Sequence, residues 1–97
     1  MYEILIEDRA ALDFQNGIDY YDEQQAGLGK KFNDSFENEI SALSKNPFYQ
    51  LRYSTIRCKP IKKFPYLIHF QVNEANKIVF VFAIINTSKD PGKAWLK

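Results

Sequence analysis

Residues 10–47 read AALDFQNGIDYYDEQQAGLGKKFNDSFENEISALSKNP. Apolar side chains recur in each half at spacings of four, four and three, first at Ala10, Phe14, Ile18 and Tyr21, then at Phe32, Phe36, Ile40 and Leu43. This spacing places one apolar stripe on each of two amphipathic helices. Gly27-Leu28-Gly29 supplies a tight connection between them, with Gly27 as the C-terminal stop of the first helix. Asn46-Pro47 ends the second helix, because proline disfavours helical backbone in the preceding residue. The stretch therefore predicts an antiparallel helical hairpin whose apolar stripe another layer must cover.

Strand patterns flank this hairpin on both sides. Residues 2–6 predict a short strand, and Asp8 is expected to cap the first helix. Residues 53–61 alternate as one strand, with one face formed by Tyr53, Thr55, Arg57 and Lys59 and the other by Ser54, Ile56 and Cys58. Residues 66–72 predict the next strand, residues 73–76 a hairpin loop, and residues 77–85 an apolar strand buried on both faces. We therefore expect one α+β domain over residues 1–97: an N-terminal strand, the helical hairpin, a three-stranded antiparallel meander completing a single sheet, and a short polar C-terminal tail.

The composition is that of a globular protein that needs no metal or disulfide crosslink. It has 97 residues, of which 45% are hydrophobic, and its 15% aromatic content can form a core without metal or disulfide. Cys58 is the only cysteine, so an internal disulfide is excluded. The longest apolar run, residues 78–85, is far shorter than the roughly 20 residues that a membrane-spanning helix needs. The acidic N-terminus does not resemble a signal peptide, so we expect a cytoplasmic protein with no membrane contact.

Charge is divided unevenly along the chain. Residues 1–44 carry ten acidic and three basic side chains, net −7, whereas residues 45–97 carry two acidic and ten basic side chains, net +8. Two interpretations stay open. Either one half meets a polyanion or an acidic partner, or the two halves attract each other within the fold.

A family resemblance rests on several short motifs that follow one another along nearly the whole chain. They are Asp19-Tyr20-Tyr21, Gln24-Gln25, Gly27-Leu28-Gly29, Asn46-Pro47, Ile56-Arg57, Lys63-Phe64-Pro65-Tyr66, and Ser88-Lys89-Asp90-Pro91 with Trp95. In this order the chain resembles the RelE/ParE superfamily, the toxins of bacterial type II toxin–antitoxin systems. The resemblance implies a cognate antitoxin that binds the toxin in a hetero-oligomer. It also implies one of two targets: RelE-like members are ribosome-dependent mRNA endonucleases, and ParE-like members poison DNA gyrase.

The residues needed for RNA cleavage are only partly present. Cleavage requires a general base, a general acid and cations at the phosphate. Arg57 and Lys59 share a predicted strand face, and Lys62, Lys63 and Lys89 can add positive potential. In the RelE-type interpretation the catalytic candidates are therefore Arg57, Lys59 and Lys89. By the resemblance we would expect histidine where Asn86 stands and a tyrosine in the tail, and neither is present.

The remaining reactive side chains have simpler explanations. His69, the only histidine, is expected to be a half-exposed strand residue with no role. Cys58 is expected to be a small buried thiol rather than a nucleophile. One histidine and one cysteine supply no usual metal-ligand set, so we expect no metal and no cofactor.

The stretch from Gln24 to Gly29 favours the ParE side by resemblance. We therefore expect a toxin that inhibits DNA gyrase, with target or antitoxin binding carried by Arg57, Lys59, Lys62, Lys63, Lys93 and Trp95. The alternatives are a RelE-type mRNA endonuclease and an inactive family member. Whether the chain is an enzyme depends on this choice.

Overall fold

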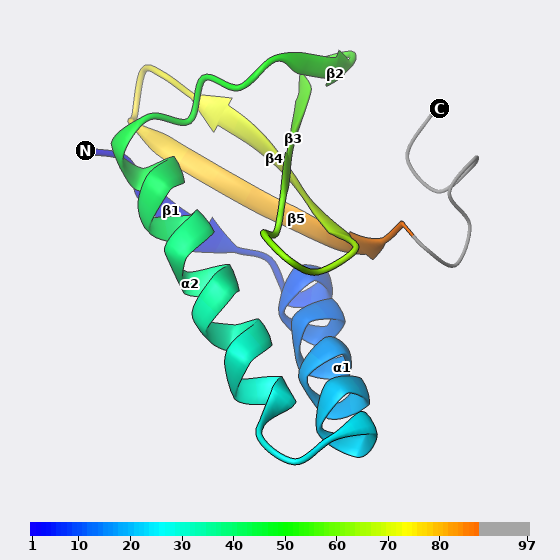
Figure 1. Ribbon diagram of the computed structural model, residues 1–97. Coiled ribbons are helices and arrows are strands. Elements are labelled where there is room, and N and C mark those ends of the chain that lie inside the picture. Colours follow the sequence, from blue (N-terminus) through cyan, green and yellow to red (C-terminus); the bar gives the residue numbers. More distant parts are fainter. Residues whose placement is uncertain (88–97) are drawn as a thin grey trace.

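The helical hairpin and a five-stranded sheet form two layers in the computed structural model, which describes residues 1–87 (Figure 1). The elements in chain order are β1 (Glu3–Ile6), α1 (Asp8–Gln24), α2 (Leu28–Lys45), β2 (Leu51–Tyr53), β3 (Ile56–Pro60), β4 (Tyr66–Asn73) and β5 (Ile78–Asn86). Across the sheet the strands run β1-β5-β4-β3-β2. Strand β1 pairs with β5 in parallel, and the other neighbours are antiparallel. The α+β class and the single sheet after a helical hairpin are confirmed, and the sheet is mixed.

Of the three predicted helix-end sites, at Asp8, Gly27 and Asn46-Pro47, the structure confirms the last. Helix α2 ends at Lys45, directly before Asn46-Pro47, as predicted. The expected cap at Asp8 is wrong: Glu7 occupies the N-cap position without a side-chain hydrogen bond, and Asp8 is the first helical residue. A carboxylate in the first turn still favours the helix, because it faces the positive end of the helix dipole.

The connection between the helices depends on Gly27. Helix α1 already ends at Gln24, so Gly27 is the N-cap of α2 rather than the stop of α1. Its φ of 88° lies in the left-handed region, which glycine adopts without steric cost. The connection is further fixed by the Gly29 N–H, which donates to Asp22 Oδ1 at 2.9 Å.

The core lies between the hairpin and one face of the sheet. Its buried members come from both helices, from β4 and β5, and from Ile61, which follows β3; they include Phe32, Phe36, Leu43, Ile61, Ile68 and Phe70. Phe14 of α1 stacks on Phe36 of α2 with ring centroids 4.3 Å apart. The sheet therefore covers the apolar stripe of the hairpin, as expected.

The strand expected over residues 53–61 is confirmed only from Ile56 to Pro60. The chain forms two strands here, β2 and β3, separated by a turn at Ser54-Thr55. Ser54 has a φ of 49°, and this left-handed residue reverses the chain where the apolar alternation predicts that it continues. The reversal also breaks the predicted face, because Tyr53 reaches His69 whereas Lys59 reaches α2.

Strands β4 and β5 form the longest pairing of the sheet. Their register runs from Tyr66 opposite Asn86 to Asn73 opposite Ile78, so the predicted hairpin is confirmed. A bulge lies where His69 is opposite Ala83 but the next residue, Phe70, is opposite Val81. Bulges of this kind bend a sheet and reorient the side chains beside them.

Candidate functional site

Arg57 and Lys59 lie on the side of β3 that faces the helices. Their register partners on β4 are Phe70 and Ile68, which are fully buried in the core against the hairpin. Residues directly opposite each other in neighbouring strands share one face of a sheet. Both cations therefore emerge beside α2 and the linker from residue 46 to residue 50.

Lys59 is held in an ion pair with Glu39 of α2. Its Nζ lies 2.5 Å from Glu39 Oε1, and the two side chains are only 12% and 11% exposed. Burial alone would lower the pKa of Lys59, but interactions with Glu39 and Tyr49 outweigh it and raise the pKa above its ordinary value. The Tyr49 ring lies 4.8 Å from the ammonium. Lys59 is thus charged at neutral pH, and a phosphate could bind it only by displacing Glu39.

Glu39 also fixes a turn of the sheet. Its Oε2 accepts a hydrogen bond from the Lys62 backbone N–H at 3.1 Å, which ties the β3–β4 turn to α2. Sequence reasoning missed Glu39, although a signal existed. Positions 32, 36, 39 and 43 also follow helical spacing, so residue 39 shares a face with Phe32, Phe36 and Leu43.

Arg57 also has partners within the protein, on the linker after α2. Its Nη1 donates to the Tyr49 carbonyl oxygen at 2.5 Å, and its guanidinium carbon lies 5.4 Å from the centre of the Phe48 ring. Its Nε is buried and has no hydrogen-bond partner among the described residues. The geometry indicates that Arg57 fixes the path of the linker after α2, with one of its polar atoms left for an additional acceptor.

The opposite face of β3 and β4 carries a cluster of three reactive side chains. His69 Nδ1 lies 3.1 Å from the Tyr53 hydroxyl and 3.6 Å from the Cys58 sulfur. The expectation of a half-exposed histidine is wrong, because His69 is fully buried, and its Nε2 has no hydrogen-bond partner within residues 1–87. His69 lies beside the bulge, opposite Cys58 on β3 and Ala83 on β5. Cys58 itself is half-buried.

The three groups of this cluster are neutral at pH 7. Burial, followed by the charges of Arg52 and Arg9, lowers the pKa of His69 to about 4. Burial raises the pKa of the Cys58 thiol, an effect that Arg52 partly offsets. The pKa of Tyr53 is raised by burial and by Cys58. A fully buried neutral imidazole cannot reach a substrate hydroxyl, so the cluster does not offer the general base that RNA cleavage needs.

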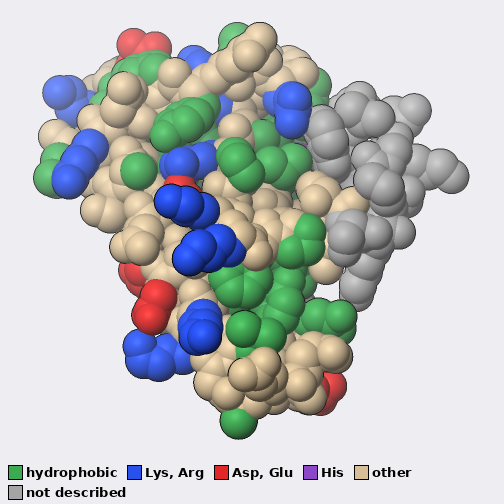
Figure 2. Space-filling view, in the orientation of Figure 1, with side chains coloured by type: hydrophobic (Ala, Val, Ile, Leu, Met, Phe, Trp, Pro, Cys, Tyr) green, Lys and Arg blue, Asp and Glu red, His purple; other side chains and the backbone are tan. Residues whose placement is uncertain are grey.

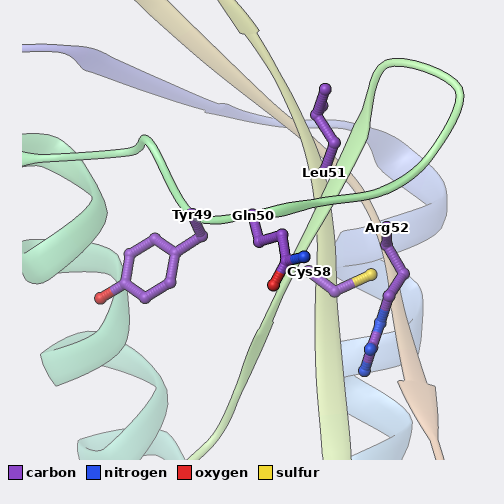
Figure 3. A pocket seen from close by; sticks show the side chains of 5 residues that line it. All are labelled: Tyr49, Gln50, Leu51, Arg52 and Cys58. Carbon is purple, nitrogen blue, oxygen red and sulfur yellow. The ribbon is translucent and has the colours of Figure 1, made fainter.

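A hollow of about 350 Å³ opens beside this cluster (Figure 3). Its lining residues are Tyr49, Gln50, Leu51, Arg52 and Cys58. In Figure 3 the Cys58 sulfur points toward the Arg52 side chain, whereas the Tyr49 ring points toward α2. Arg52 and Tyr53 were not among the predicted site residues. The predicted strand began only at residue 53, so the β2 hairpin that brings them to this face was not visible.

The other predicted site residues lie apart from this hollow or outside the described residues. Lys62 and Lys63 are exposed in the turn between β3 and β4, as expected. Lys89, Lys93 and Trp95 lie outside the described residues. Within residues 1–87 no group of three metal-ligating side chains comes together. None of the helices described there is long and apolar enough to cross a membrane.

The two halves of the chain meet in a buried ion pair, Glu39–Lys59. The pairs Arg9–Asp13 and Lys30–Asp34 lie within the acidic half and are exposed on at least one side. Lys31, Lys62 and Lys63 form no ion pair with any described residue. Attraction between the halves thus leaves part of the basic charge available to a partner.

Comparison with known proteins bears on the fold. The chain superimposes on a chain of the chromosomal ParDE TA system from P. aeruginosa with a TM-score of 0.74 and 16% identity, covering 89% of this chain and 96% of that one. A chain of the intact E. coli RelBE toxin-antitoxin complex gives a TM-score of 0.66 and 16% identity, covering 87% and 94%. No protein-family model and no curated protein matches the sequence. The predicted RelE/ParE-like fold is confirmed.

Proposed function

We propose that this chain is the toxin of a type II toxin–antitoxin system, that it stops bacterial growth by ParE-type inhibition of DNA gyrase, and that a cognate antitoxin neutralises it. The fold shared with chains of the ParDE and RelBE systems supports the toxin class. The motifs that run along the sequence support it independently. We expect both partners in the cytoplasm.

The intramolecular contacts of Arg57 and Lys59 are the observation that favours gyrase inhibition over RNA cleavage. A nuclease must present cations to the phosphate whose charge grows in the transition state. Here Lys59 is nearly buried against Glu39, and Arg57 donates to the linker carbonyl of Tyr49. The only histidine of the chain is buried and neutral. A toxin that acts by binding needs none of these groups to be free.

A second candidate function is the RelE-type mRNA endonuclease. The observation in its favour is the positive potential around the His69 cluster, where Arg52 and Arg9 both lower the pKa of His69. Such potential attracts phosphate groups. In this alternative Arg52 would hold the phosphate, and Lys89 would remain a catalytic candidate.

Pulse labelling after tightly controlled induction in a bacterial host tests the proposal. Gyrase inhibition predicts that thymidine incorporation falls within minutes while methionine incorporation continues. The purified chain should then block gyrase supercoiling of a relaxed plasmid. An early fall of methionine incorporation with cut mRNA would establish the endonuclease instead, and Arg52→Gln should then lower cleavage by about two orders of magnitude. No effect on either label would reject toxin activity altogether.

A further inference from the structure

A second hollow, of about 430 Å³, lies between the first turns of α2 and the β3–β4 turn. Its lining residues are Leu28, Lys31, Asp34, Ser35, Lys63 and Phe64. Figure 2 shows Lys and Arg side chains beside a stretch of hydrophobic ones on this face of the molecule. We call this the hairpin hollow. It is on the opposite side of the sheet from the cluster around His69.

The floor of the hairpin hollow is apolar and held in place. Phe64 is half-buried, and its ring lies 4.9 Å from the ring of Tyr21 and 5.1 Å from that of Phe32. Phe32 is fully buried in the core. A half-exposed aromatic surface backed by a rigid core loses little freedom when a partner covers it, which is typical of residues that anchor an interface.

The rim of the hairpin hollow carries uncompensated positive charge. Lys31 and Lys63 are exposed and form no ion pair with any described residue, and neighbouring Lys62 is in the same state. Asp34, the acidic residue of the lining, is already paired with Lys30 at 3.0 Å. The walls of the hollow therefore present lysines from α2 on one side and from the turn on the other.

The turn that carries Lys63 is fixed in an unusual backbone conformation. Lys63 has a φ of 74°, which residues other than glycine rarely adopt. The surrounding turn holds it there, because the Phe64 N–H donates to Ile61 O at 3.1 Å and the Lys62 N–H donates to Glu39. Strained residues of this kind are common at binding sites.

We propose that the hairpin hollow binds an acidic segment of a partner protein, with one apolar side chain on Leu28 and Phe64 and flanking carboxylates on Lys31 and Lys63. Charge complementarity selects an acidic occupant. The apolar floor formed by Leu28 and Phe64 selects a peptide over a nucleic acid, whose phosphates would gain nothing from it. The identity of the partner as the antitoxin rests on the proposed function; the binding chemistry does not.

Nuclear magnetic resonance on the nitrogen-15-labelled full chain tests this assignment. The probes are the peptide acetyl-EELFEE-amide, the same peptide with every Glu replaced by Lys, and a twelve-nucleotide oligothymidylate. We expect saturable amide shifts at Leu28, Lys31, Lys63 and Phe64 with the acidic peptide and none there with the other probes. Shifts confined to another surface, or displacement of the peptide by the oligonucleotide, would overturn the proposal.

Charge reversal supplies the matched control. The double variant K31E/K63E should weaken binding of the acidic peptide about tenfold at low salt, because two exposed charge pairs are lost. The control K45E/K77E changes the net charge equally at exposed lysines away from the hairpin hollow and should leave binding within about twofold. Equal weakening by both variants would refute a specific site. The single variant K31E, on a regular helix, should still weaken binding about threefold if K63E disturbs the turn. If the acidic peptide binds but induction of the chain does not stop growth, the binding site stands and the proposed function fails.

Discussion

The ion pair between Glu39 and Lys59 gives the sharpest test of how this chain uses its cations. Lys59→Met keeps most of the apolar stem of the side chain but removes the charge. Glu39, 11% exposed, would then keep a buried carboxylate with the Lys62 N–H as its remaining partner. Removing one member of a buried pair costs about 3–5 kcal/mol. Because the pair retains slight exposure, we expect about 3 kcal/mol, a large part of the roughly 5–15 kcal/mol that stabilises a domain of this size.

The double variant E39Q/K59M separates the ion pair from the burial of either side chain. The introduced glutamine would keep an oxygen that can accept the Lys62 N–H, and no unpaired charge would remain, so we expect a loss of only about 1 kcal/mol. Urea unfolding at pH 7 measures both values, and the Lys59→Met midpoint should fall by about 2 M. The raised pKa of Lys59 means that the result should hold across neutral pH.

Two results would refute this reasoning. The first is a Lys59→Met variant that loses less than about 1 kcal/mol, which would show that Glu39 and Lys59 are not coupled in the folded protein. The second is a variant that keeps full stability and loses activity. In that case Lys59 would act on the target itself, and it would again be a candidate cation for the RNA-cleaving alternative.

Three further predictions concern stability. The pKa of His69 is about 4 in the folded chain against an ordinary 6.5, so the unfolded chain binds a proton first as the pH falls. The unfolding free energy should therefore drop by about 2 kcal/mol between pH 7 and pH 5. A His69→Leu variant measured by urea unfolding should lack this drop. Gly17→Ala would place a Cβ 2.8 Å from Cε2 of the buried Phe32 ring, so it should lower the thermal midpoint through a net loss of about 1–2 kcal/mol, whereas Asn16→Ala on the exposed face should not. Asp13 Oδ2 accepts the Ile84 N–H at 3.1 Å, so Asp13→Ala should cost about 2 kcal/mol in chemical denaturation and Asp13→Asn, which keeps an acceptor, clearly less.

The sequence predicted the elements whose signals are local. The apolar spacing of four, four and three, the glycines near residue 27 and the proline at residue 47 identify the helical hairpin, because each acts through backbone sterics or through one face of a helix. The apolar strands over residues 66–72 and 77–85 were predicted from an equally local signal, the pattern of apolar residues within each segment. The cap at Asp8 failed, since Asp8 is already helical and Glu7 occupies the cap position without a side-chain bond.

The tertiary structure alone decided which charged residues remain available. Alternation placed Arg57 and Lys59 on one strand face correctly, but it could not tell that this face turns toward α2, where Glu39 lies two helical turns beyond Phe32. Nor could it show that Ser54 reverses the chain and brings Tyr53 to a buried His69. Periodicity reports which side chains share a face; pairing across the fold reports what that face meets. Whether a lysine binds a partner or completes an ion pair depends on contacts between segments far apart in the sequence, and no local pattern encodes those contacts.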